Sequence, residues 1–223
     1  MSGVLETQAS TAPPASPPAM PLHQALLYIV AAMVLALAQG LGQGFVSVNV
    51  PQIAGDLGIS ATDASWLMAA YMIPRAALPI MLIKIRTQYG LRRFAEVGLV
   101  AYLLVSFASV WIYDLRSAIV VQVLSGCAAA PLSTLAFMYM LEPLAAQWKM
   151  RLGLPLAMAA LSVGPLLARV ISPHLIGDGG LTWVHLVALG LAMASLALVF
   201  RLPLRPVPHQ KVIQSTDFIS FVL

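Results

Sequence analysis

The sequence predicts an all-α membrane protein with six transmembrane helices, and two observations carry that prediction. First, 60% of the 223 residues are hydrophobic and only 9% are charged, whereas soluble domains are about 45–50% apolar and about 25% charged. Second, apolar stretches near the length of about 20 residues that a spanning helix requires recur along the chain. They cover residues 26–50, 66–83, 94–113, 117–141, 152–176 and 183–200. No comparable stretch remains for a soluble domain.

Short polar breaks separate the six stretches and set the expected helix ends. The breaks are residues 55–63, 84–93, 114–116, 143–151 and 177–180. Aspartate, glycine, proline and basic residues gather in them, and such residues either end helices or are costly in lipid. We therefore expect a surface loop at each break.

Both ends of the chain lie outside the predicted six-helix bundle of residues 23–200. Residues 1–22 lack Lys and Arg and are rich in Pro, Ala, Ser and Thr, which predicts a disordered tail and not a signal peptide. Residues 201–216 read as a basic, Pro-rich linker. Residues 217–223 start another apolar run that is too short to span a bilayer. This predicts the front part of a longer protein, cut as a seventh helix begins; the alternative is a short interfacial segment.

The basic residues predict the orientation in the membrane. Nine of the 12 Lys and Arg residues lie in residues 84–93, 149–151 and 201–211, which all fall on one side of a six-helix topology. The loops of the other side hold four aspartates and one arginine. Because Lys and Arg in short loops stay in the cytoplasm, we expect a multi-pass plasma-membrane protein, as in a bacterial inner membrane, with both termini cytoplasmic.

The composition also excludes several partners. The charges are too few to line a phosphate track, so nucleic acid is not an expected partner. A single cysteine, Cys127, excludes a disulfide framework and a Cys-based zinc site. His174 and His185 flank Asp178, but their spacing matches no usual metal-ligand pattern, and we read them as solvated loop-end residues. We expect no metal and no cofactor.

Arg75 is the clearest candidate for a functional residue. It lies nine residues from both Trp66 and Lys84, about 13 Å from either end of the second helix, too deep to snorkel freely. Pro74 and Pro79 would free carbonyl groups in the same helix. Two interpretations remain open: the arginine pins neighbouring helices through their carbonyls, or it binds a substrate or a coupling ion.

Other intramembrane polar residues are weaker candidates. Gln39 and Gln43 are four residues apart, hence on one face of the first helix, beside the glycines of residues 40–44. The glycines predict close helix packing, and the amides form either part of that packing face or a substrate-facing pair. Arg169 lies seven residues from the expected helix end at Ile176, so it can snorkel outward; a substrate or coupling role is the alternative.

The arrangement as a whole resembles the N-terminal half of a major facilitator superfamily transporter, in particular the fourteen-helix drug:proton antiporter branch. That fold implies a half-bundle of two three-helix repeats. Residues 89–93 resemble the end of the family's loop signature between helices two and three, with Gly90, Arg92 and Arg93. Gly164 and Pro165 resemble the core of the antiporter signature in helix five. Further similarities lie in residues 46–53, 66–71 and 182–183.

The sequence also departs from this branch. The leading glycine and the acidic residue of the loop signature fall on Ile83 and Thr87, and a frequent acidic residue of helix one falls on Gly42. The helix-four arginine falls on Gln122. The glycines that follow the helix-five signature fall on Ala168, Ser172 and Pro173. The resemblance therefore does not extend to residues for the family's usual proton coupling.

The resemblance implies a transporter and not an enzyme. It would carry out secondary active transport or efflux of small, drug-like molecules by alternating access, with the lipid bilayer, a small-molecule substrate and the C-terminal half of the same transporter as partners. One alternative is a truncated or split fragment that does not transport alone. A remote alternative is an intramembrane serine protease built on Ser125-Gly126 and His185; residue 123 is Val where that motif needs Gly.

Overall fold

A computed structural model describes residues 20–202, apart from the side chains at positions 83, 91, 146, 175–182, 184 and 185. Within that part of the chain all regular structure is helical, which confirms the predicted all-α class. Most of the expected tail of residues 1–22, nearly all of the linker of residues 201–216 and the whole of residues 217–223 lie outside the described residues.

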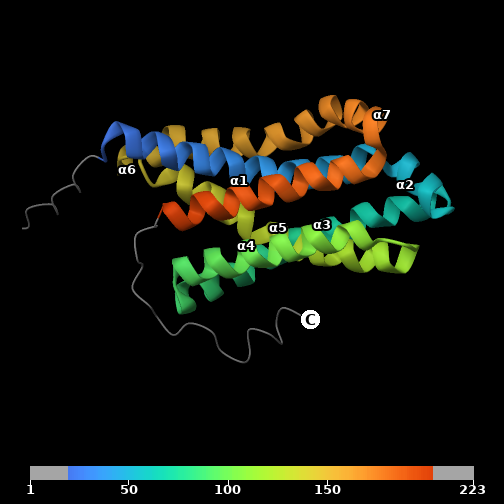
Figure 1. Ribbon diagram of the computed structural model, residues 1–223. Coiled ribbons are helices and arrows are strands. Elements are labelled where there is room, and N and C mark those ends of the chain that lie inside the picture. The colour runs from blue at the N-terminus through green and yellow to red at the C-terminus, as the bar shows by residue number, and fades with distance from the viewer. Residues whose placement is uncertain (1–19, 203–223) are drawn as a thin grey trace, which may run out of the picture.

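The helices run roughly parallel to one long axis (Figure 1). In chain order they are α1 (Leu22–Val48), α2 (Val50–Leu57), α3 (Ala61–Tyr89), α4 (Leu91–Ala108), η1 (Ser109–Trp111), α5 (Leu115–Leu141), α6 (Ala146–Trp148), the π-helical η2 (Lys149–Gly153) and α7 (Leu154–Arg201). We call the two ends of the bundle the α2 end and the α6 end, after the short helices that mark them in Figure 1.

Five segments of the described chain are long and apolar enough to cross a membrane. They are Leu22–Val48, Ala61–Leu82, Arg92–Trp111, Leu115–Leu141 and Lys149–His174. The sixth predicted helix corresponds to a shorter apolar segment, Leu186–Arg201.

The predicted loop at residues 84–93 is wrong. α3 continues to Tyr89 and α4 begins at Leu91, so only Gly90, with a φ of 83°, interrupts the helix within residues 84–93. Hydropathy marks where side chains leave lipid, but backbone hydrogen bonds carry the helix further, and a basic residue such as Arg86 in its last turn favours this. Glycine adopts the positive φ of the turn without steric cost.

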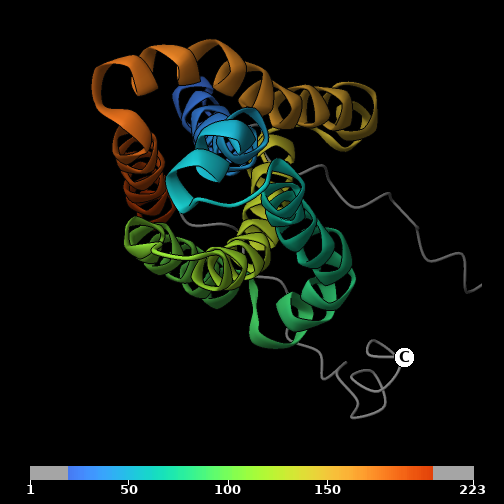
Figure 2. The same ribbon diagram turned by 90° about the vertical axis from the view of Figure 1, so that its right-hand side faces the viewer.

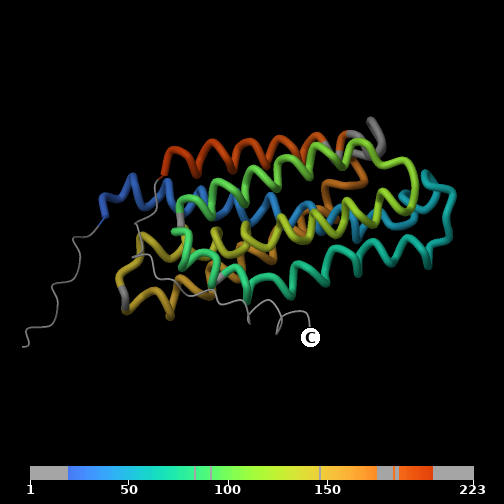
Figure 3. Tube along the Cα trace, turned by 90° about the horizontal axis from the view of Figure 1, so that it is seen from below, coloured from blue at the N-terminus to red at the C-terminus, as the bar shows by residue number. Residues whose placement is uncertain are grey.

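The predicted loop at residues 177–180 is also wrong, because the backbone there is helical and belongs to α7. Residues 154–174, the first arm of α7, and Leu186–Arg201, the second arm, nevertheless run in opposite directions (Figures 1 and 3). The two arms therefore occupy the places expected for the fifth and sixth helices, although the backbone between them stays helical.

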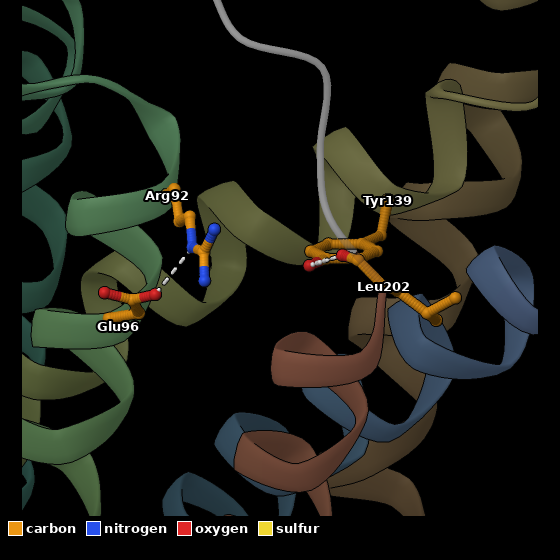
Figure 4. A network of polar contacts seen from close by, with 4 residues as sticks. All are labelled: Arg92, Glu96, Tyr139 and Leu202. Atoms are coloured by element: carbon orange, nitrogen blue, oxygen red, sulfur yellow. Dashed lines mark hydrogen bonds and ion pairs between the residues drawn. The ribbon is translucent and has the colours of Figure 1, made fainter.

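α1 and α5 form the centre of the bundle. Half of the most apolar window of each is buried, against 11% for α3. α7 packs on α1, α3 packs on α5, and α4 contacts both α5 and α7; viewed along the axis, these helices surround the central pair (Figure 2). At the α6 end the Tyr139 hydroxyl of α5 donates to the Leu202 carbonyl at 2.9 Å and fixes the end of α7 (Figure 4).

Polar caps fix the helix starts at the α2 end. Ser60 accepts the Asp63 N–H at 3.1 Å before α3. Asp114 accepts the Ser117 N–H at 2.8 Å, and the Ser117 hydroxyl oxygen accepts the Asp114 N–H at 3.1 Å, which forms a capping box before α5. Such contacts satisfy N–H groups that a helix start leaves unpaired. The hydrogen bonds from Ser117 hold the pKa of the Asp114 carboxyl below its usual range.

Candidate functional site

Arg75 of α3 reaches α1, as expected from its depth in the helix. Its Nη1 donates to the Gln43 Oε1, and its guanidinium carbon lies 5.8 Å from the centre of the Tyr71 ring. Gln43 is oriented in turn, because its Nε2 donates to the Met72 Sδ at 3.4 Å. Both groups that hold Arg75 are neutral, and a cation above an aromatic face is attractive. These contacts therefore do not balance the positive charge of the half-buried arginine.

Gln39 lies one turn before Gln43 and is completely buried. Neither its amide nitrogen nor its amide oxygen has a hydrogen-bond partner among the described residues. Its backbone carbonyl accepts the Tyr71 hydroxyl at 3.4 Å, so the same tyrosine contacts both Gln39 and Arg75. An unpaired buried amide costs about 1–3 kcal/mol. A water, a substrate or a moved side chain at this position would recover that free energy.

The glycines of α1 make the close helix contact that the sequence predicts. A Cβ atom added to Gly164 would lie 2.6 Å from the Gly40 Cα, and one added to Gly40 would lie 2.9 Å from the Pro165 ring. Gly44 lies against Pro165 and Ala168 in the same way. Gly164 and Pro165, singled out by the family resemblance, therefore lie at the crossing of α1 with the first arm of α7. Their observed role is backbone packing.

A second glycine contact positions α3. Gly126 of α5 lies directly against the Tyr71 backbone and the Pro74 ring, so a side chain at this position would push α3 away. Pro74 immediately precedes Arg75 in the sequence. The crossing of α3 with α5 thus fixes the height and direction from which Arg75 approaches α1.

Two adjoining cavities lie between this group and the α2 end. The larger is about 410 Å³ and the smaller about 70 Å³. They share lining residues, including Phe45, Ser109 and Gln122. The smaller cavity also touches Tyr71 and Tyr102, so it reaches the aromatic ring beneath Arg75. The cavities form a partly polar path from the α2 end toward the Arg75 group.

Asn49 and Ser172 are polar residues that the sequence did not reveal as a pair. Asn49 lies at the break between α1 and α2, lines the larger cavity and is 2% exposed. Its Oδ1 accepts the Ser172 hydroxyl at 2.8 Å, while its Nδ2 has no partner among the described residues. The two residues are 123 positions apart. The available sequence signal was a polar residue two positions before Pro51, at the end of an apolar stretch.

The other predicted residues lie apart from this group. Arg169 is exposed on the first arm of α7, and the described residues show no contact between it and Arg75 or Gln43. Gly90 turns the chain at the α6 end, where Arg92 pairs with Glu96 at 2.9 Å (Figure 4).

The described side chains give little support to a metal site or to the serine protease alternative. They contain no group of three His, Cys, Asp or Glu residues placed to hold a metal. Ser125, the nucleophile of the protease alternative, lines the smaller cavity. The side chains of His185 and Asp178 are not described, and His174 is exposed.

Comparisons with known proteins agree on one fold. Residues 32–221 match the family model of the Major Facilitator Superfamily. The structure of the proton:xylose symporter XylE bound to 6-bromo-6-deoxy-D-glucose matches with a TM-score of 0.66 and 14% sequence identity. The match covers 81% of this chain and 45% of that chain, so this chain spans a little under half of the symporter's length. No curated protein sequence matches the chain.

Proposed function

Because the chain belongs to the major facilitator superfamily, we propose that it is the N-terminal half of a secondary transporter that moves small, drug-like molecules by alternating access. The chain is a multi-pass membrane protein of a transporter family, as the family match and the apolar helices indicate. Efflux as the direction of transport is part of the same proposal, and it rests on the resemblance in residues 89–93 and in Gly164-Pro165.

The observation that carries the proposal is the contact of Arg75 with Gln43, next to the unpaired amide of Gln39. A guanidinium has five N–H donors in one plane, and Gln43 accepts one of them. The remaining donors and the Gln39 amide suit a substrate that bears a carbonyl, carboxylate or phosphate oxygen. The adjoining cavities supply an approach to this group from the α2 end.

The proposal includes the orientation of the bundle in the membrane. The α6 end holds Lys84, Arg86, Arg92 and Arg93, and the α2 end holds Asp56 and Asp114. Basic residues at one end favour its retention in the cytoplasm. We place the α6 end in the cytoplasm of a plasma membrane, with the bacterial inner membrane as the expected location, so that the cavities open outward.

Transport by the complete protein tests the role of Arg75. We expect Arg75→Lys to abolish export of a fluorescent substrate from cells while the amount of folded protein stays normal, because a compact ammonium cannot reproduce the planar donor fork. Arg116→Lys, in the first turn of α5, is the matched control and should transport normally. If Arg75 only pins helices, Arg75→Ala will lower the folded yield. Normal export by both Arg75 variants would remove this residue from the mechanism.

A further inference from the structure

A third cavity, separate from the two near Arg75, lies at the α6 end, on the side of the bundle formed by α3, α4 and α5. It is an apolar groove of about 470 Å³ with Leu82, Ile85, Val97, Ala101 and Leu124 among its lining residues. Val97 is 69% exposed and Leu124 is 46% exposed, so the groove is open along its length. α3 and α4 touch at the Gly90 turn and contact each other little beyond it, which leaves the space between them.

The groove has the length of one lipid leaflet. On α4 its lining residues recur every four positions, from Arg93 through Val97 and Ala101 to Val105, so they form one stripe. That stripe is about 18 Å long at 1.5 Å per residue. Half of the hydrocarbon core of a bilayer is about 15 Å thick. A fatty acyl chain that starts at the membrane surface would therefore end near the inner end of the groove.

Arg93 is the charged residue in the groove lining, and it lies at the end near the membrane surface. Its neighbour Arg92 is engaged with Glu96 on another face of α4 (Figure 4). Arg93 is exposed, and Lys84 and Arg86 of α3 add positive charge at the same end. A cation at the mouth of an apolar groove complements a negatively charged headgroup above a hydrocarbon chain.

We propose that this groove binds one acyl chain of an anionic phospholipid whose phosphate contacts Arg93. The apolar lining excludes a polar solute, and burying the chain removes hydrocarbon surface of both lipid and protein. The arginine selects the lipid by charge, since clustered basic residues at the membrane surface bind anionic headgroups. This site is separate from the Arg75 group and needs no transport to be observed.

Photocrosslinking in nanodiscs tests the proposal with the full chain. The probe is phosphatidylglycerol with a diazirine at the end of one acyl chain, in phosphatidylcholine discs. We expect crosslinked peptides to come mainly from residues 94–131. Unlabelled phosphatidylglycerol should displace the probe better than phosphatidylcholine does. Cys127 lines the groove and is the chain's one cysteine, so its alkylation by N-ethylmaleimide should slow when phosphatidylglycerol is present.

Variants separate headgroup selection from groove filling. Arg93→Gln should lower the preference for phosphatidylglycerol over phosphatidylcholine about fivefold, the contribution of one basic residue at an anionic surface. Arg92→Gln, one residue away and outside the groove, should leave the preference unchanged. Ala101→Trp should fill the groove and reduce crosslinking by the phosphatidylglycerol probe. Size-exclusion profiles equal to that of the native chain establish that each variant is folded.

Three results would overturn the proposal. The first is equal displacement by the two lipids in the native chain. The second is an Arg93→Gln preference equal to that of Arg92→Gln. The third is a probe spread evenly over the first arm of α7 and the groove, which would show that the lipid does not prefer the groove. Because no readout measures transport, failure here leaves the proposed function intact.

Discussion

The crossing of α1 with α7 makes the sharpest prediction about stability. In Gly164→Ala the new Cβ atom would lie 2.6 Å from the Gly40 Cα and 3.1 Å from the Leu41 backbone nitrogen. Ordinary contacts begin near 3.4 Å, so the two backbones must separate by about 0.8 Å. Overpacking of this kind typically costs about 1–3 kcal/mol. The cost cannot be relieved by a rotamer change, because the contacted atoms belong to the backbone.

Gly190→Ala is the matched control, because it lies on the same helix and its added Cβ meets nothing within 4 Å. Both variants gain the same helix propensity, up to about 1 kcal/mol, so their difference isolates the packing cost. For a chain of this size 1 kcal/mol changes Tm by about 2–4 °C. Gly164→Ala should therefore melt about 2–12 °C below Gly190→Ala.

Fluorescence-detected size exclusion after heating measures both melting temperatures in the same detergent. Gly190→Ala should melt at or above the native temperature. Equal Tm values for the two variants would show that α1 and α7 do not approach at Gly164, and the helix crossing described above would have to be abandoned.

Three further predictions concern topology, a cap and the α6 end. In a cysteine-free background, cysteines at Asp56 and Thr87 should react with an impermeant thiol reagent from opposite sides of the membrane; labelling of both from outside would overturn the proposed topology. The pKa of Asp114 is lower in the folded chain than in the unfolded one, so its carboxylate stabilises the fold above the unfolded value, and this stabilisation is lost as pH falls through the folded pKa. Asp114→Asn, which still caps a helix, should show less acid-dependent loss of Tm than the native chain, and an identical pH profile would contradict the assignment. Tyr139→Phe removes the hydrogen bond to the buried Leu202 carbonyl and should cost about 1–3 kcal/mol; an unchanged Tm would show that this bond does not hold the end of α7.

Some features of the site could be predicted because they depend on depth in a helix. Arg75 lies too far from either end of its helix to reach water, so it had to find a polar group inside the bundle. Gln43 was one of two amides at comparable depth, and the structure shows that contact. Gly40 and Gly44 predicted a close helix approach, because small side chains permit it, but their partners on α7 could not be read from the sequence.

The sequence by itself determined that the chain is a bundle of apolar helices and which apolar stretches form them. Each helix partitions into lipid through its own composition, which is a local property. The loop predicted at residues 84–93 is too long, since only Gly90 interrupts the helix there. Helical hydrogen bonds continue beyond the apolar region. Only the tertiary structure decided which faces meet, as in the bond of Ser172 to Asn49 across 123 positions. The physical reason is that lipid favours every apolar helix face alike. Only packing between helices determines which face of one helix contacts which neighbouring helix.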